Sequence, residues 1–282
     1  MHFYLSTSND PYYNLALEEY LLKHLHEDIL LCYVNVPSIV VGRFQVPYRE
    51  VSAPFVYDKD IKMARRLSGG GTVYHDLGNL NYSYITNCAD QATNYYDLFN
   101  QKTLDVLTSL GLGDLSFQRN NIFCQEKKIS GVAQYKRGKR MVHHGTLLVD
   151  ADLQQLRTVF TPKDYYQTKG VASVSSSVAN VNSFVHLTMA DVIKAFEASC
   201  DEVLQALSAD EGVVEMADYY STKEWIFGKS PKYTLEKADA TLLVEQGRVV
   251  SVSDPRHSTL VGLYHSFEDV LSSEIENAAL FF

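Results

Sequence analysis

This chain lacks the features that mark secreted, membrane-spanning and disulfide-bonded proteins. No apolar run approaches the roughly 18 residues that a membrane span requires. Residues 1–6 have no basic start, apolar core or cleavage site of a signal peptide. The cysteines are scattered, with no Cys-x-x-Cys pair, at Cys32, Cys88, Cys124 and Cys200. We therefore expect a cytoplasmic protein with no membrane association, with buried thiols and with neither a disulfide framework nor a zinc site.

Positive charge is also scarce. The chain has 25 Lys and Arg against 34 Asp and Glu, a net charge of −9, which argues against nucleic acid as the main partner. One stretch is an exception, and its basic residues are Lys127, Lys128, Lys136, Arg137, Lys139 and Arg140. The simpler interpretation of residues 136–140 is a solvated hairpin turn. The functional alternative is a basic edge that receives an acidic protein or a phosphate.

The order of elements predicts an α+β fold with a full hydrophobic core. The chain has 282 residues, 46% of them hydrophobic, and no internal repeat. Periodicity predicts helices at residues 10–24, 94–110 and 191–207, and strands at 29–35, 39–41, 80–85, 122–124, 128–135 and 141–149. Runs of strands with occasional helices favour α+β over alternating βαβ units.

A boundary is expected near Pro231, where the pattern changes. Residues 241–244 and 249–252 read as a hairpin with its turn near Gln246 and Gly247. The predicted domains are residues 1–232, a catalytic domain, and residues 233–282, a short accessory region near the lower size limit for independent folding.

The most informative stretch combines three consecutive glycines with two arginines: Arg65-Arg66-Leu67-Ser68-Gly69-Gly70-Gly71-Thr72-Val73-Tyr74-His75-Asp76-Leu77-Gly78-Asn79. It fits neither the phosphate-binding Walker loop nor the dinucleotide fingerprint. Both arginines offer forked donors suited to phosphate or carboxylate. A tight turn between strands is the alternative. Because a strand pattern follows, we expect a strand–glycine loop–strand anion site built on backbone N–H groups.

As a whole, this stretch resembles the glycine motif of the lipoate–protein ligase family. Other segments agree in the same order: residues 10–19, the Gly-Arg-x-Gln turn at 42–45, and residues 119–122, 128–133, 143–148, 169–174 and 225–231. The resemblance covers about residues 8 to 235. It implies the biotin/lipoate ligase fold, with a mixed or antiparallel sheet and a small, abbreviated C-terminal α+β appendage.

The resemblance also implies an ATP-dependent reaction and its site. Lys128 would be catalytic and bridge the lipoate carboxylate and the α-phosphate of ATP. Strand alternation puts Lys128 and Ser130 on one face and Ile129 on the other. The residues implied to bind ATP or lipoyl-AMP are Arg66, Gly69, Gly70, Gly71, Thr72, Val73, Tyr74, His75, Asn79, Asn121, Lys128 and His144. His75 and His144 would orient the ligand, with at most one of His143 and His144 facing it, and residues 170–181 would form a loop over the adenylate.

The chemistry needs charge neutralisation more than a base. A carboxylate, with a pKa near ~4, is already ionised when it attacks the α-phosphorus. Arg66, the loop N–H groups, Lys128 and a Mg²⁺ ion would neutralise the transferring group and the leaving pyrophosphate. The lipoyl group would pass to a lysine of an acceptor. The implied acceptors are lipoyl domains of 2-oxoacid dehydrogenase E2 subunits and/or the H protein of glycine cleavage.

Several departures from the family pattern keep alternatives open. Asn121 stands where relatives usually have an aspartate suited to Mg²⁺, and Val46, Val132 and residues 175–177 also differ. One alternative is a lipoyl or octanoyl transferase that works without ATP. Cys124 is near Lys128, but the cysteine nucleophile of such transferases lies further upstream. The other alternative is a homologue that binds lipoate or nucleotide and has lost catalysis.

Overall fold

The computed structural model describes residues 1–88, 93–204, 211–237 and 240–273. The chain forms two compact units, and each is made of separate stretches of the chain. Unit 1 comprises Met1–Pro37, His75–Leu153 and Ser175–Asp218, and unit 2 comprises Ser38–Tyr74, Gln154–Val174 and Tyr219–Phe282. The C-terminal tail thus groups with residues 38–74 and 154–174, while the expected boundary after residue 232 stays a prediction.

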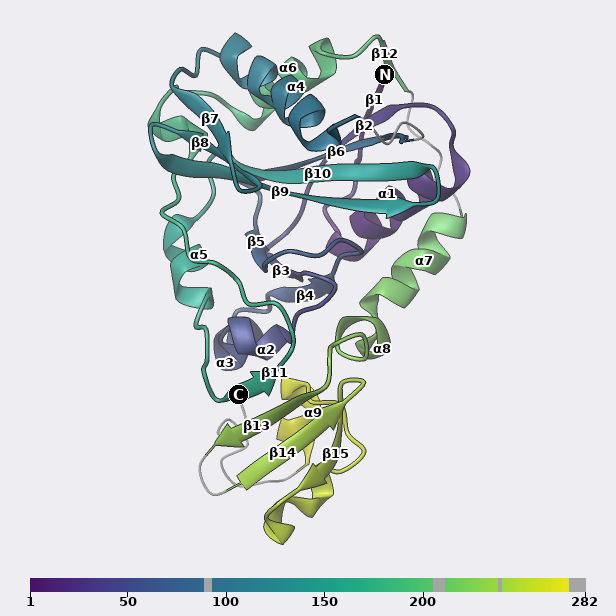
Figure 1. Cartoon of the computed structure of the whole chain (residues 1–282), viewed down its shortest axis with the longest axis vertical. Coiled ribbons are helices and arrows are strands. Elements are labelled where there is room, and N and C mark those ends of the chain that lie inside the picture. The colour runs from purple at the N-terminus through teal and green to yellow at the C-terminus, as the bar shows by residue number, and fades with distance from the viewer. Residues whose placement is uncertain (89–92, 205–210, 238–239, 274–282) are drawn as a thin grey trace. The chain divides into compact units, whose positions relative to one another are not determined.

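Unit 1 is built on a mixed sheet of eight strands in the order β12-β1-β2-β6-β10-β9-β8-β7 (Figure 1). The strands are β1 (His2–Leu5), β2 (Ile29–Val34), β6 (Asn79–Asn87), β7 (Leu115–Gln118), β8 (Asn121–Cys124), β9 (Lys127–Arg137), β10 (Arg140–Leu148) and β12 (Glu202–Val203). Strand β1 runs parallel to both of its neighbours, β2 and β12. All other neighbouring strands in this sheet, from β2 to β7 in the order given, pair antiparallel. The predicted α+β class with a mixed sheet is confirmed.

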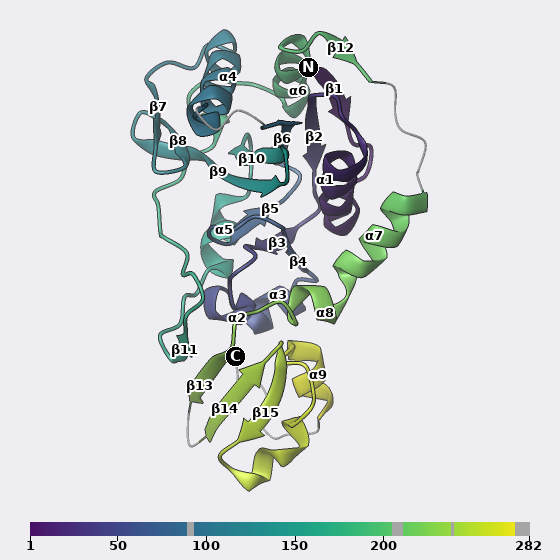
Figure 2. The same cartoon turned by 45° about the vertical axis from the view of Figure 1, so that its right-hand side comes forward.

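Helices cover both faces of this sheet. Helix α1 (Pro11–His24) lies on one face, and α4 (Tyr95–Ser109) and α6 (Met189–Ala198) lie on the other (Figures 1 and 2). The α4/α6 face is apolar: Tyr84 stacks on Phe99 and Tyr82 on Phe196, with ring centroids 4.9 and 5.3 Å apart. The sheet therefore has one face that belongs to the core, and the α1 face is free to carry polar residues.

The predicted ends of the first two helices are confirmed. The side chain of Asp10 accepts from the N–H of Tyr12 at 2.8 Å. Pro11 is the first residue of helix α1, where a backbone N–H would have no partner within the helix. Helix α4 is followed by Gly111 at φ +90°, the left-handed conformation that ends helices.

The third predicted helix, residues 191–207, is wrong at its end. Helix α6 stops at Ala198, and positions 205–207 lie outside the described residues. The backbone beyond it pairs with β1 instead, through Asp201 N–H to Met1 C=O at 3.0 Å and Leu204 N–H to Phe3 C=O at 2.8 Å. Strand β1 needs a partner for its outer backbone groups, and this need outweighs the helical propensity of the sequence.

Unit 2 contains two small sheets, β4-β3-β5 and β11-β13-β14-β15. The strands are β3 (Ser38–Val41), β4 (Lys62–Arg65), β5 (Val73–His75), β11 (Tyr166–Thr168), β13 (Tyr233–Lys237), β14 (Ala240–Glu245) and β15 (Arg248–Val252). The helices are α2 (Pro47–Glu50), α3 (Ala53–Asp58), α8 (Lys223–Ile226) and α9 (Phe267–Ser272). Helices α5 (Leu153–Val159) and α7 (Glu211–Ser221) contribute residues to both units, and two 3₁₀ turns occupy Val181–Ser183 and Pro255–Leu260.

The predicted C-terminal hairpin is confirmed. Gln246 and Gly247 have φ +50° and +72°, the positive angles of the two-residue turn that suits a twisted hairpin. The sheet takes its edge strand β11 from residues 166–168, far earlier in the chain. Across the described residues, no helix is both long and apolar enough to cross a membrane.

Candidate functional site

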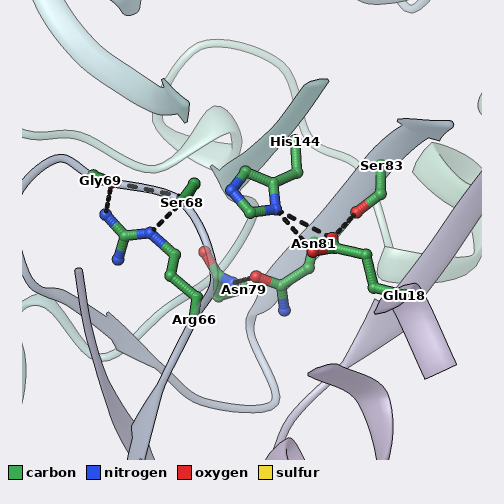
Figure 3. Close-up of polar contacts among 8 residues, drawn as sticks. All are labelled: Glu18, Arg66, Ser68, Gly69, Asn79, Asn81, Ser83 and His144. Carbon is green, nitrogen blue, oxygen red and sulfur yellow. Dashed lines mark hydrogen bonds and ion pairs between the residues drawn. The ribbon is translucent and has the colours of Figure 1, made fainter. Parts of the chain in front are cut away.

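In unit 2 the glycine loop connects β4 to β5, a short strand that precedes the one expected at residues 80–85, and it is folded around the side chain of Arg66. The Arg66 Nη2 donates to the carbonyls of Gly69 at 2.8 Å and Gly71 at 2.7 Å, and Nε donates to Ser68 Oγ at 3.0 Å. Figure 3 shows Arg66 with Ser68 and Gly69. Nη1 donates to Val40 C=O at 3.0 Å. Arg66 is therefore the internal support of the loop.

This arrangement decides which way the loop amides point. In a planar trans peptide the C=O and N–H groups point in opposite directions. Because the carbonyls of Gly69 and Gly71 point at Arg66, the N–H groups of Gly70 and Thr72 point away from it. Gly70 has φ +92°, which glycine adopts without strain. The Thr72 N–H donates to Ser173 Oγ at 3.0 Å, so the Gly70 N–H is the outward donor that the loop offers to an anion, backed by a buried positive charge.

Gln45, from the Gly-Arg-x-Gln turn, braces this loop and is fully buried. Its Oε1 accepts from Gly42 N–H at 2.9 Å and Thr72 Oγ1 at 2.8 Å, and its Nε2 donates to Ser173 Oγ at 3.1 Å. The Ser173 Oγ also accepts from Thr72 N–H at 3.0 Å. A side chain on Gly42 would place its Cβ 2.2 Å from Gly70 C=O, so only glycine allows this approach. The turn, the loop and the start of the 170–181 segment are one hydrogen-bonded assembly within unit 2.

Arg65 does not offer its donors to a ligand, contrary to the expectation for both arginines. It is fully buried, and burial lowers the pKa of its guanidinium to about 9. Its acceptors are the carbonyls of Gly42, Arg43, Gln45 and Ile226 and the hydroxyl of Ser230. Arg65, the last residue of β4, ties the turn at 42–45 to residues 226–230, whereas Arg66, the first residue after the strand, supports the glycine loop.

In unit 1 the α1 face of the sheet is polar. Helix α1 buries Glu18, whose carboxylate accepts from Ser83 Oγ at 2.5 Å and from His144 Nδ1 at 2.9 Å (Figure 3). Because Ser83 pairs with His144 across β6 and β10, both lie on the same face. Sequence reasoning missed Glu18. Its helical spacing from Leu15 and Leu21 places it on the buried stripe of α1, which was the available signal.

His143 points to the opposite face, so the expectation that at most one of the two histidines faces the site is confirmed. Its Nδ1 accepts from Gln134 Nε2 at 2.9 Å, and the rings of Tyr96 and Phe99 lie with centroids 5.6 Å away. Burial lowers the pKa of His143 to about 3, so its imidazole is neutral. His143 is a core residue.

Lys128 also lies on the α1 face, but the predicted alternation around it is wrong. Strand β9 contains a bulge, because Ser130 pairs with Ile122 while Lys128 pairs with the very next residue of β8, Phe123. Ile129 is the extra residue and is fully buried in the core, and Ser130 Oγ lies 3.0 Å from Tyr82 OH on the same core face. The bulge turns Lys128 to the other face, a known role of bulges beside active sites.

Lys128 and Asn121 come together over Gly131. A Cβ on Gly131 would lie 3.1 Å from Lys128 Nζ and 3.6 Å from Asn121 Oδ1. Asn121 Nδ2 donates to Arg119 C=O at 3.1 Å. In the described parts of the chain, no three His, Cys, Asp or Glu side chains are grouped so that they could hold a metal. One neutral amide oxygen does not fit a protein-held Mg²⁺ ion, which prefers carboxylates.

The remaining predicted residues lie at the ends of β5 and β6. His75 Nδ1 accepts from Asn35 Nδ2 at 3.0 Å, and Tyr74 OH accepts from Gln155 Nε2 at 2.6 Å. Asn79 Nδ2 donates to Asn81 Oδ1 at 3.2 Å, while Asn79 Oδ1 is buried with no partner among the described residues. Unit 2 thus gathers Arg66 and residues 69–74, and the α1 face of unit 1 gathers Asn79, Asn121, Lys128 and His144.

The basic run at residues 136–140 forms the turn between β9 and β10, as the simpler interpretation predicts. Gly138 has φ +61° in this turn. Arg140 is buried and donates to the carbonyls of His26 at 2.9 Å and Glu27 at 3.1 Å. Its charge therefore anchors the hairpin to the chain before β2.

Comparison with known proteins identifies the family. The model of the lipoyl protein ligase A/B catalytic domain matches residues 10–201. The chain belongs to this family. The lipoate-protein ligase LplJ of Bacillus subtilis (strain 168) is 33% identical over 297 aligned positions, covering 95% of this chain and 86% of its own length. The alignment thus extends beyond the catalytic domain.

Two solved structures of this family are similar to the chain. One is a lipoate-protein ligase A bound with ATP, with 29% identity and a TM-score of 0.66, covering 80% of this chain and 98% of its own. The other is a bi-partite lipoate protein ligase from Thermoplasma acidophilum, solved in work that includes its E2 lipoyl domain. It has 27% identity and a TM-score of 0.67, covering 80% of this chain and 95% of its own.

Proposed function

We propose that this chain is an ATP-dependent lipoate–protein ligase that forms lipoyl-AMP and transfers the lipoyl group to a lysine of an acceptor domain. The single observation that carries the proposal is the bulge in β9. It places the family's lysine, Lys128, on the polar face of the sheet at the expense of regular strand pairing. Family membership and the intact glycine loop support the same function.

Activation requires a negatively charged carboxylate to approach an α-phosphate that is also negative. The Lys128 ammonium neutralises charge at this step, and the outward Gly70 N–H of the glycine loop donates to a phosphate oxygen. Arg66 acts through the loop: it keeps the carbonyls turned inward and contributes a permanent positive charge behind the amides. The polar side chains of Asn79 and His144 orient the substrate.

The transferase alternative finds little support at its candidate nucleophile. Cys124 is buried, and its Sγ–H donates to Gly113 C=O at 3.3 Å. Burial raises the pKa of this thiol, whereas nucleophilic cysteines have lowered values. Asn121 remains the observation that favours a homologue without catalysis.

For the acceptor we propose a lipoyl domain of an E2 subunit, or the H protein of glycine cleavage. The support is the archaeal relative, which was studied together with its E2 lipoyl domain. That relative is called bi-partite and leaves about a fifth of this chain unmatched, since it covers 80%. Residues 233–282 amount to a similar share. We therefore propose that this chain carries its own accessory region and needs no second polypeptide.

Incubation with ATP, lipoate and an acceptor lipoyl domain tests the function. Lys128→Ala should remain folded and lose about 100-fold or more of lipoyl-AMP formation. The matched control is Lys139→Ala, because Lys139 is exposed in the turn between β9 and β10 and contacts neither Gly131 nor the segment beside Lys128. Full activity of folded Lys128→Ala, or lipoyl transfer without ATP, would contradict the proposal.

The accessory region is tested by two rates on one acceptor domain. The first is the rate from lipoate plus ATP, and the second is the rate from supplied lipoyl-AMP. We expect both to be rapid, because the loop, Arg66 and Lys128 are all in place. Slow activation with fast transfer would show that another polypeptide is needed.

A further inference from the structure

The backbone of Lys128 is held by a segment that is distant in sequence. Lys128 N–H donates to Ser177 C=O at 2.9 Å, and Ala179 N–H donates to Lys128 C=O at 3.0 Å. Together they form a parallel bridge between Lys128 and Val178. Pairing of β9 with β10 ends at Ser130, so residues 177–179 take the place of β10 beside Lys128. The position of Lys128 therefore depends on where this segment is fixed.

Asn180 fixes it. The Asn180 Nδ2 donates to Ala151 C=O at 2.9 Å, and Asn180 Oδ1 accepts from Ala151 N–H at 3.1 Å. A side-chain amide thus satisfies both backbone groups of Ala151, as a neighbouring strand would. This pair comes directly after Ala179, so no free residue separates it from the bridge to Lys128.

Ala151 is itself rigidly held by the end of the glycine motif. Gly78 C=O accepts from Asp150 N–H at 2.9 Å, and Asp76 Oδ2 accepts from Asp152 N–H at 2.7 Å. A Cβ on Gly78 would lie 2.1 Å from Asp150 C=O, so the two turns are in direct backbone contact. Hydrogen bonds and single steps along the chain thus connect Asp76 to Lys128: Asp76 binds Asp152, its neighbour Ala151 binds Asn180, and the preceding Ala179 binds Lys128.

We propose that Asn180 is a positioning residue for lipoate activation: it fixes residues 177–179 beside Lys128 and thereby holds the ammonium over Gly131. This inference rests on the role proposed for Lys128. Loss of the amide leaves both groups of Ala151 unpaired and releases the segment that pairs with Lys128. A displacement of about 1 Å at a reacting group costs on the order of 100-fold in rate, so the effect falls on kcat.

The test compares Asn180→Ala with Asn182→Ala. Asn182 is a matched control, because it lies two residues further on and its Oδ1 accepts from Leu187 N–H at 2.9 Å, away from Ala151 and Lys128. We expect Asn180→Ala to lower kcat for lipoyl-AMP formation by about 10- to 100-fold, with KM for ATP and lipoate nearly unchanged. Hydrogen exchange at the Lys128 and Ala179 amides should become faster in Asn180→Ala alone. Asn180→Asp, which keeps the acceptor for Ala151 N–H, should recover part of kcat.

Three results would distinguish a wrong role for Lys128 from a wrong positioning role for Asn180. If Lys128→Ala keeps its activity, the role proposed for Lys128 is wrong, and the inference falls with it. If Lys128→Ala is inactive while Asn180→Ala matches Asn182→Ala in kcat, only the positioning inference is overturned. The inference is equally overturned if Asn180→Ala raises KM without lowering kcat, since a displaced ammonium would slow the chemical step.

Discussion

Gly131→Ala is the smallest substitution that should move the Lys128 ammonium without removing it. The added Cβ would lie 3.1 Å from Lys128 Nζ and 3.3 Å from Cε. Carbon contacts are comfortable at about 3.5–4.0 Å, so the end of the lysine side chain must retreat by roughly half an ångström. Asn121 Oδ1, at 3.6 Å, already lies at an ordinary contact distance. The perturbation is therefore confined to Lys128.

The substitution should leave the fold intact. Gly131 is not among the glycines with positive φ, so alanine fits its backbone, and the stiffer unfolded chain should add about 0.4–1 kcal/mol of stability. Activity should move the other way. If a 1 Å error costs about 100-fold, half of it costs roughly 10-fold in kcat.

Lipoate-dependent release of pyrophosphate in a single turnover measures this effect, with thermal unfolding measured alongside. Gly113→Ala is the matched control, since nothing lies within 4 Å of a Cβ placed there. We expect Gly113→Ala to keep wild-type activity. A stable Gly131→Ala that activates lipoate as fast as Gly113→Ala would refute the assignment of the reactive position to the space over Gly131.

Further predictions concern three other side chains. Arg66→Lys keeps the positive charge but loses the planar guanidinium that holds two loop carbonyls. We therefore expect a folded protein that forms lipoyl-AMP about 100-fold more slowly. A wild-type rate would contradict the proposed dependence of the loop on Arg66. Cys124→Ser should keep full activity, and mass spectrometry should detect no acyl-cysteine; an acyl group on Cys124 would reverse the choice against a transferase. The pKa of His143 is about 3 in the folded protein and about 6.5 in the unfolded chain. Between these two values the unfolded state binds more protons, so the free energy of unfolding decreases as the pH falls through this window. His143→Phe should flatten the pH dependence of the free energy of urea unfolding in this window, by on the order of 5 kcal/mol across it. An unchanged pH dependence would assign the acid sensitivity to other groups.

Local signals in the sequence were enough for most of the fold of unit 1. Helix α1 was predicted because Asp10 and Pro11 form a local start signal, and α4 because its apolar spacing ends in Gly111. What the sequence could not give was pairing between distant segments. Strand β12 beyond α6, and strand β11 beside β13, exist because an open sheet edge elsewhere requires a backbone partner.

The candidate site, like the fold, could be predicted from the sequence only in part. The glycine loop and Lys128 could be named from residue types, since glycine runs and arginines have few other uses in that order. The face of Lys128 could not be named, because strict alternation fails at Ile129, and a bulge leaves no fixed mark in composition. The role of Arg66 as an internal support was also invisible, because the carbonyls that it binds belong to every residue type.

The bulge in β9 also links the face of Lys128 to the packing of the core. If all residues of β9 paired evenly with β8, Lys128 would share the face of Ser130, against the core. Removal of Ile129, the extra residue, would also give even pairing, but Lys128 would then directly precede Ser130 and stay on the polar face. The deletion would instead take a fully buried apolar side chain out of the core. The bulge thus gives β9 one additional core side chain without moving the ammonium, and loss of Ile129 should lower stability more than activity.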